Sequence, residues 1–144
     1  MNHIYITSDP LDDASITAIV ADNAHGATVI FQGITRNNTG NREVLFLEYE
    51  AYAPMAEKTL NQVRDEILSK WDVKIAIHHR IERVDIGQTS LLVAVGSAHR
   101  EAAFEACKYS LDRIKEIVPI WKKEHFFGGE IWIGDADGFR PIEG

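Results

Sequence analysis

Residues 90–124 read SLLVAVGSAHREAAFEACKYSLDRIKEIVPIWKKE, and this stretch decides how the chain is organised. Leu91 to Val95 is a short apolar run rich in β-branched residues, which is typical of a buried strand. After Gly96 the period changes, and apolar residues recur every three or four positions, as on one side of a helix. This apolar stripe comprises Phe104, Cys107, Leu111, Ile114 and Val118.

Both ends of the expected helix carry sequence signals. Ser97 is a candidate N-cap, and Pro119 disfavours helical geometry at Val118, so the helix should end near there. His99 and Arg100 therefore lie where a strand passes into a helix N-terminus. Unpaired backbone N–H groups and two side chains that can carry positive charge predict an anion-binding site at this point.

Two lysines follow in the same stretch. Lys115 adjoins the apolar stripe, and Lys122 follows Pro119 in a segment that we expect to be extended. Because the chain turns at Pro119, both ammonium groups are expected to face one cleft. The simpler alternative makes Lys115 a solvated surface residue that pairs with Asp112, three positions earlier on the helix.

The rest of the chain predicts an α+β fold, because long helices are interleaved with strands that pair as hairpins. Strands are expected at residues 4–7, 27–36, 44–50, 73–78 and after Pro119. Further helices are expected at residues 8–23 and 54–71. The strands at 27–36 and 44–50 should form one hairpin, with a bulge or close approach at Gly33, and Gly128-Gly129 suits another.

Composition excludes several classes of protein. A length of 144 residues predicts one domain, 1–144, and a formal charge of −7 argues against nucleic-acid binding. There is no apolar run of the ~18 residues that span a membrane and no signal-peptide pattern at the start, so we expect a cytoplasmic protein. The single cysteine, Cys107, forms no internal disulfide and looks like a buried hydrophobe.

The histidines do not predict a metal site. His78 and His79 are adjacent on an expected half-buried strand, so they point to opposite faces and do not chelate one ion easily. We interpret them as the solvated end of that strand. No cofactor or metal is predicted.

Three motifs of residues 90–124 have a distinctive joint spacing: Ser97-Ala-His99-Arg100, Ala103-Phe-Glu-Ala106 and Lys115-x3-Pro119-x-Trp-Lys122-Lys-Glu124. A second set lies upstream: Gly26-Ala-Thr-Val-Ile-Phe31-Gln-Gly33-Ile-Thr-Arg36-Asn37, Leu47-Glu-Tyr-Glu50 and Met55. In both sets, from about Gly26 to Trp132, the chain resembles the large, catalytic subunit of molybdopterin synthase.

The resemblance implies an α/β-hammerhead fold with an additional antiparallel sheet, and a homodimer within a heterotetramer. It implies insertion of two sulfurs into cyclic pyranopterin monophosphate, to give the dithiolene of molybdopterin. The sulfur donor is then the C-terminal thiocarboxylate of a small ubiquitin-like carrier subunit with a Gly-Gly tail. Some members of the family use a basic residue near the C-terminus of the partner protomer, but residues 133–140 show no obvious match.

The resemblance also assigns residues. Lys115 and Lys122 are the expected catalytic groups, Lys115 for proton transfer or contact with the acyl carbon and Lys122 for stabilising negative charge. The expected substrate-binding residues are Ile34, Thr35, Arg36, His99, Arg100, Lys115, Lys122, Lys123 and Glu124. Arg36, His99 and Arg100 are expected to form the cationic cluster that binds phosphate.

Two other functions use the same residues differently. A non-enzymatic module that binds a phosphorylated ligand needs the anion site but neither lysine in the cleft. A structural subunit without a ligand leaves the whole basic cluster unexplained. Formation of a dithiolene product from the pterin and a thiocarboxylated carrier separates the enzyme from both.

Overall fold

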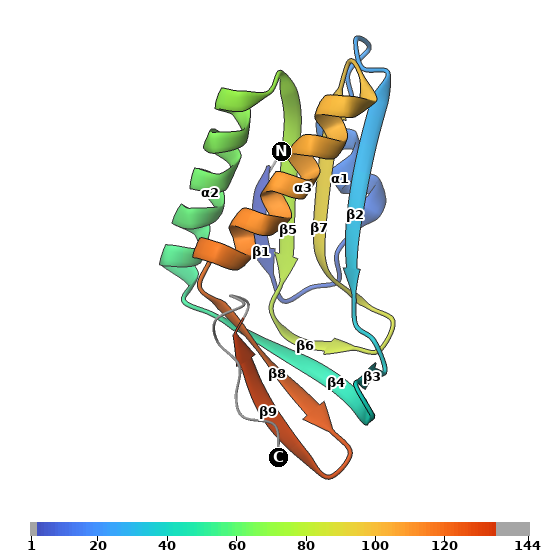
Figure 1. Cartoon of the computed structure of the whole chain (residues 1–144), viewed down its shortest axis with the longest axis vertical. Coiled ribbons are helices and arrows are strands. Elements are labelled where there is room, and N and C mark those ends of the chain that lie inside the picture. Colours follow the sequence, from blue (N-terminus) through green and yellow to red (C-terminus); the bar gives the residue numbers. More distant parts are fainter. Residues whose placement is uncertain (1–2, 135–144) are drawn as a thin grey trace.

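The computed structural model describes residues 3–134, which form two β-sheets and three helices (Figure 1). In chain order the elements are β1 (Ile4–Thr7), α1 (Asp13–Val20), β2 (Ala27–Ile34), β3 (Asn38–Thr39), β4 (Arg42–Ala51), α2 (Ala53–Lys70), β5 (Val73–Arg80), β6 (Glu82–Asp85), β7 (Thr89–Ser97), α3 (Arg100–Ile117), β8 (Ile120–Phe126) and β9 (Gly129–Gly134). The α+β prediction is confirmed. Within residues 3–134, no helix is long and apolar enough to cross a membrane.

The first sheet has the strand order β1-β5-β7-β2 and lies between helices. Helix α1 covers one face, while α2 and α3 lie on the other (Figure 1). Strands β5 and β7 are therefore buried on both faces: Ile75 and Val93 belong to the main core under α2 and α3, while Ala76 and Leu92 belong to a smaller core with α1. Strands buried on both faces lose the alternation of apolar and polar residues.

The second sheet extends beyond one end of the helices (Figure 1). It has the order β3-β4-β8-β9, and β6 pairs with β4. Strand β8 begins at Ile120, three residues after the last helical residue of α3, because Pro119 prevents the helix from continuing. The extended segment after Pro119 and the hairpin at Gly128-Gly129 are both confirmed, and both glycines have positive φ, 97° and 152°.

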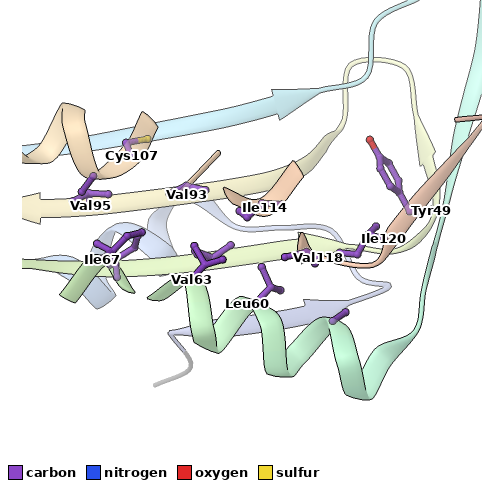
Figure 2. Packing of buried hydrophobic residues seen from close by; sticks show 14 of the residues in the cluster. Tyr49, Leu60, Val63, Ile67, Val93, Val95, Cys107, Ile114, Val118 and Ile120 are labelled. Carbon is purple, nitrogen blue, oxygen red and sulfur yellow. The ribbon is translucent and has the colours of Figure 1, made fainter. Parts of the chain in front are cut away.

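The main core joins the two long helices to the first sheet and to the base of the second. Figure 2 shows Leu60, Val63 and Ile67 of α2 facing the sheet and α3. Full burial of an aliphatic side chain of this size stabilises a fold by about 1.5–3 kcal/mol. Tyr49 and Ile120 extend the same cluster into the second sheet, which fixes the position of β4 and β8.

The predicted hairpin of residues 27–36 with 44–50 is wrong. Strand β2 pairs with β7 in the first sheet, and β4 pairs with β3, β6 and β8 in the second. A register shift between Gly33 and Ile34 confirms the predicted bulge. The chain leaves the first sheet just beyond this bulge, so the local turn at residues 39–42 joins β4 only to the short β3.

Helix α3 differs from its prediction in two details. Phe104 is 61% exposed and does not belong to the core, whereas Ala103, Ala106 and Ser110 are buried. The helix lies so close to β2 and β7 that small residues fill the contact. Ser97 is not the N-cap, because His99 holds that position and Ser97 Oγ instead accepts a hydrogen bond from the His99 backbone N–H at 3.4 Å.

Two further expectations are corrected. The first helix begins at Asp13 rather than near residue 8, because Asp12 caps it by accepting from the Ala14 N–H at 3.0 Å. His78 and His79 are buried, at 6% and 3% exposure, rather than solvated. Helix α1 covers the face of β5 that carries Ala76 and His78, whereas His79, on the other face, packs against Tyr49 of β4.

Candidate active site

A pocket of about 440 Å³ lies where the two sheets meet the C-terminal end of α3. Residues from β2, β4, β7, α3 and β8 contribute to its wall. The lining residues are Phe31, Gly33, Ile34, Arg36, Thr39, Val44, Leu47, Tyr49, His79, Ser90, Leu91, Leu111, Asp112, Ile114, Lys115, Lys122 and Glu124. The volume is sufficient for a small organic molecule.

Lys115 and Lys122 both line this pocket, so the prediction that they face one cleft is confirmed. Lys115 lies in the last turn of α3, where the helix dipole favours a positive charge. Lys122 lies on β8 directly opposite Tyr49 of β4, and its side chain is half-buried. The turn at Pro119 brings the helix end and the strand against the same space.

Arg36 supplies a third cation from another part of the chain. It follows β2 just past the bulge at Gly33 and lines the pocket beside Ile34. Both side chains are exposed, so they lie near the mouth rather than deep in the wall. Three cationic side chains and two carboxylates, those of Asp112 and Glu124, line the pocket, so it keeps a positive excess in a chain of net charge −7.

The inner wall is polar and ordered by hydrogen bonds. Tyr49 Oη donates to Ser90 Oγ at 3.1 Å, and Ser90 Oγ donates to the Gly33 carbonyl at 3.3 Å. His79 lies edge-on to the Tyr49 ring, and its Nδ1 is 2.7 Å from the Arg80 carbonyl. A carbonyl only accepts, so Nδ1 carries the proton. Burial lowers the pKa of His79 to about 4, which keeps this ring neutral near pH 7.

Glu124 completes the wall from β8. Residues two apart on a strand share a face, so Glu124 points to the same side as Lys122. The side chain is 5% exposed, and its Oε2 accepts no hydrogen bond from the part of the chain that the structure describes.

Two predicted site residues lie outside the pocket wall, as far as residues 3–134 define it. Lys123 is on the opposite face of β8, in register with Glu48 of β4. Thr35 is buried beside the pocket, and its backbone N–H donates to the Gln88 carbonyl at 3.0 Å. Met55, a residue of the upstream motif, lies on the first turn of α2, outside the pocket lining, and is 41% exposed.

His99 and Arg100 are not part of this pocket. They stand at the N-terminus of α3, with both side chains exposed, whereas Lys115 lies near its C-terminus. At about 1.5 Å per residue, the helix separates Arg100 from Lys115 by roughly 22 Å. The prediction that His99 and Arg100 join Arg36 in one cluster is therefore wrong within a single chain. The predicted C-terminal partner segment, near residue 140, lies outside the described residues.

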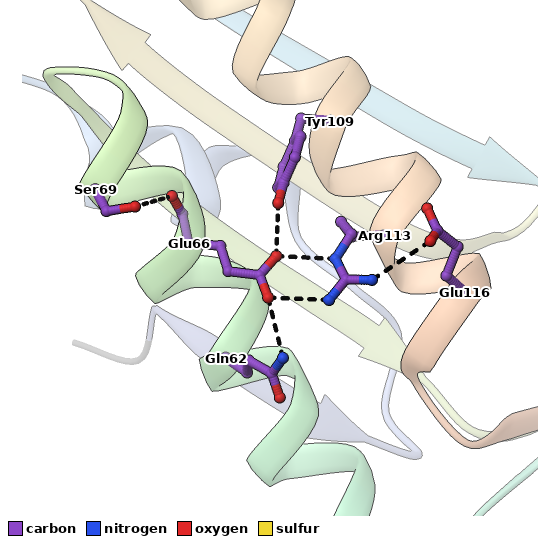
Figure 3. A network of polar contacts seen from close by, with 6 residues as sticks. All are labelled: Gln62, Glu66, Ser69, Tyr109, Arg113 and Glu116. Carbon is purple, nitrogen blue, oxygen red and sulfur yellow. Dashed lines mark hydrogen bonds and ion pairs between the residues drawn. The ribbon is translucent and has the colours of Figure 1, made fainter.

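An ion-pair network fixes the end of α3 that carries Lys115. Arg113 donates to both carboxylate oxygens of Glu66 on α2, at 2.8 and 3.0 Å (Figure 3). Tyr109 Oη donates to the same carboxylate at 2.6 Å, and Gln62 donates at 3.0 Å. These donors, Arg113 first, lower the pKa of Glu66 to about 2. A bidentate contact of this kind restrains both position and orientation.

Sequence reasoning missed His79, Tyr49 and Ser90 as wall residues. One signal was present for His79: the segment between Lys74 and Arg80 contains no charged residue, which favours a strand buried on both faces. Tyr49 and Ser90 gave no signal of a shared site, because only the fold brings β4 beside the start of β7.

The fold and pocket together define a class: an α+β domain whose cationic pocket is suited to an anionic small molecule. A family model described as MoaE protein matches residues 6–117, and the chain belongs to this family. The resemblance found in the sequence is therefore confirmed.

Relatives support the assignment over most of the chain. A "Molybdopterin synthase catalytic subunit" of Bacillus subtilis is 46% identical over 136 residues, covering 94% of this chain and 87% of the relative. One from Nostoc is 45% identical over 131 residues, covering 89% and 79%. The crystal structure of molybdopterin synthase from Staphylococcus aureus matches with a TM-score of 0.89 and 42% identity, covering 93% of this chain and 98% of that one. The chain thus belongs to a family of enzymes.

Proposed function

We propose that this protein is the catalytic subunit of a molybdopterin synthase, in molybdenum cofactor biosynthesis. It inserts two sulfurs into cyclic pyranopterin monophosphate to give the dithiolene of molybdopterin. The sulfur comes from the C-terminal thiocarboxylate of a small ubiquitin-like carrier subunit with a Gly-Gly tail. The observation that carries this proposal is the pocket shared by Lys115, Lys122 and Arg36.

The charges of the reactants fit this pocket. The substrate phosphate and the carrier thiocarboxylate are both anions, and three cations surround a space of about 440 Å³. Arg36 at the mouth binds the phosphate through charge-assisted hydrogen bonds. Within residues 3–134, the single cysteine is buried and burial raises the pKa of its thiol, so Cys107 is a poor sulfur nucleophile.

Each sulfur transfer comprises two bond exchanges. The thiocarboxylate sulfur forms a C–S bond to a substrate carbon as the C–O bond at that carbon breaks. Water then attacks the acyl carbon, the acyl C–S bond breaks, and the carrier leaves with an ordinary carboxylate. Lys115 delivers the proton to the leaving oxygen, and Lys122 stabilises the oxyanion that forms at the acyl carbon.

His99 and Arg100 fit this function through a homodimer. The length of α3 keeps them from the phosphate bound in their own chain, but a second copy is able to bring them to the neighbouring pocket. Two copies of this chain with two carriers give the predicted heterotetramer. A Helicobacter pylori chain that shares the fold, with a TM-score of 0.72 and 21% identity, was solved as a complex of subunits 1 and 2 of molybdopterin-converting factor.

Adjacent lysines on β8 provide the direct test, because they point to opposite faces. Dithiolene formation is measured with cyclic pyranopterin monophosphate and excess thiocarboxylated carrier. Lys122→Ala is expected to lose about 10²–10³-fold in rate, as for loss of an oxyanion donor. Lys123→Ala, outside the pocket, should remain near the unmodified rate. Near-normal rates for both variants would favour the phosphorylated-ligand-binding module.

A further inference from the structure

Arg36 lies at the mouth of the pocket, on a short segment between the two sheets. Strand β2 ends at Ile34, and β3 begins at Asn38, so residues 35–37 lie outside the strands. The Arg36 side chain is exposed and long. Ordering such a side chain costs conformational entropy, so its backbone must be held in place if it is to bind an anion well.

The turn between β6 and β7 holds this segment (Figure 1). The Thr35 N–H donates to the Gln88 carbonyl at 3.0 Å, and the Gly87 N–H donates to the Thr35 carbonyl at 2.9 Å. Beyond the arginine, the Asn37 carbonyl accepts from the Val44 N–H at 2.9 Å. The residues on both sides of the cation are therefore bonded through their backbones to other elements, and the turn sets its position from one side.

Two side chains fix the shape and the place of that turn. Gln88 Oε1 accepts from the Asp85 N–H across the turn at 3.1 Å and from Arg80 Nη1 at 3.1 Å. Arg80 Nε donates to the Ser8 carbonyl at 3.2 Å, which ties the turn to the end of β5 and to the segment after β1. Gly87 has a φ of 82°, which a glycine adopts without strain. One side-chain amide oxygen therefore joins three segments of the chain.

Arg80 and Gln88 are not among the residues that line the pocket within residues 3–134, and Gln88 is exposed. Substitutions at exposed positions usually have small effects on stability, so stability alone gives little reason for a side chain with these two contacts. What the contacts determine is where Thr35, and with it Arg36, stands relative to the pocket.

We propose that Arg80 and Gln88 are positioning residues, which hold Arg36 where the phosphate of the ligand binds. That the ligand carries a phosphate rests on the proposed function. The two residues act through the turn and the Thr35 backbone rather than by touching the ligand. A guanidinium whose backbone is already placed loses less conformational freedom when it binds phosphate, so the contact is stronger.

Equilibrium binding of two ligands tests the proposal: a pterin with a phosphorylated side chain and the same pterin without the phosphate. Gln88→Ala should weaken binding of the phosphorylated ligand by about 3–10-fold, the effect of losing ordinary hydrogen bonds, and leave the other ligand unchanged. Gln88→Glu keeps an oxygen acceptor for Arg80 and the turn, so it should bind both ligands like the unmodified protein. The matched control is Gln32→Ala: Gln32 on β2 makes an exposed hydrogen bond of the same kind, from Nε2 to Asp13 at 2.8 Å, and its loss should affect neither ligand.

A second measurement tests the route through Arg36. In an Arg36→Ala background, Gln88→Ala should weaken the phosphorylated ligand no further, because both changes act on the same contact. Arg80→Ala, which leaves the hydrogen bond from Asp85 to Gln88 in place, should show the same dependence on Arg36. In the dithiolene assay, Gln88→Ala should raise KM and leave kcat unchanged, as expected when uniform binding is lost.

Full affinity for the phosphorylated ligand in folded Gln88→Ala and Arg80→Ala proteins, checked by thermal melting, would overturn the proposal. An equal loss for both ligands, or a loss that persists in the Arg36→Ala background, would overturn it as well. If Gln88→Ala does not fold, the result for Arg80→Ala decides.

The proposed function fails separately from this positioning role. A phosphate-specific loss that depends on Arg36, in a protein that forms no dithiolene even when unmodified, leaves the positioning role standing and removes the synthase. Normal dithiolene formation with an unchanged KM in the folded Gln88→Ala and Arg80→Ala proteins does the reverse.

Discussion

The two ends of α3 carry similar charges in different surroundings. At the N-terminal end, His99 and Arg100 are exposed, and the His99 side chain makes no capping hydrogen bond within the described part of the chain. At the C-terminal end, Lys115 lines a pocket, and Arg113 is held by Glu66 of the neighbouring helix. Both ends of α3 carry cations, but within residues 3–134 only those at the C-terminal end are packed against other elements. Packing around a cation, rather than its charge, therefore identifies the end that forms a site within one chain.

The largest effect is expected at the C-terminal end. Lys115→Ala should lower single-turnover dithiolene formation by about 10²–10⁴-fold, the usual contribution of a general acid or base. The exposed Lys58 on α2 provides a control, and Lys58→Ala should react normally. Thermal melts should show both variants folded. A stable Lys115→Ala protein with a near-normal rate would show that Lys115 is not catalytic, so the two ends of α3 would not differ in this respect.

At the N-terminal end the effect should appear in binding. Arg100→Ala is expected to weaken binding of cyclic pyranopterin monophosphate by about 1.5–3 kcal/mol, the range for hydrogen bonds to charged groups. Titration at low and high salt checks this, because salt screens the attraction. Unchanged affinity would show that Arg100 does not bind the phosphate.

Hybrid dimers test whether the two ends meet across an interface. If the two chains of a homodimer share their sites, each mixed dimer of Lys115→Ala with Arg100→Ala contains one site with both native residues. Random reassembly of the two variants should therefore restore about one quarter of all sites. The assay is dithiolene formation before and after mixing. Activity that stays at the level of the separate variants would show that the ends do not share a site.

A smaller effect concerns the clamp that fixes the C-terminal end. The pKa of Glu66 is lowered from 4.5 to about 2, so the folded state loses the stabilisation only as the pH falls through this range. The stabilisation by the Glu66 carboxylate is fully present above about pH 4.5. The Glu66 side chain is 25% exposed, so solvent screening limits the contribution to about 1 kcal/mol.

Urea unfolding at pH 6 and near pH 2.5 measures this contribution. Glu66→Gln should be less stable than the unmodified protein at pH 6 and nearly equal to it at the lower pH. Glu57→Gln, at an exposed position of the same helix, is the matched control and should behave like the unmodified protein. A constant difference between Glu66→Gln and the unmodified protein at both pH values would exclude the ion pair as its cause.

The smallest effect is expected at Phe104, one turn into the N-terminal half of α3. Because it is 61% exposed, Phe104→Ser should change the free energy of unfolding by less than about 0.5 kcal/mol. Ile114→Ala, at a buried position of the same predicted stripe, should cost about 2–5 kcal/mol. Comparable losses of unfolding free energy in both variants, measured by chemical denaturation, would show that Phe104 contributes to the core.

Local signals explain which parts of the fold were predictable. Helix α2 and the end of α3 followed from apolar spacing and from Pro54 and Pro119, which act on their own neighbours. The pairing of β2 with β7 did not follow, because it joins distant segments and displaces the nearer hairpin. Burial of His79 depended on Tyr49 of β4, which packs against its ring from a distant part of the chain.

In the candidate site, too, some residues followed from local signals and others depended on the fold. Lys115 and Lys122 were predictable because one turn at Pro119 relates them. Glu124 was visible only as part of a motif, since its burial depends on packing between β4 and β8. His99 and Arg100 were correctly placed at a helix start, but their distance from Arg36 depends on the direction of α3 across the sheet.

The order of strands also governs when a newly made chain acquires its site. Strand β2 finds its partner only when β7 has been synthesised, and β4 finds its longest partner, β8, later still. Contacts between distant segments form slowly, because a long loop must close first. Until β8 joins, β4 has only the short β3 and β6 beside it and exposes unpaired backbone groups to other chains. Catalytic competence and protection from aggregation therefore arrive together, when β8 adds to the second sheet.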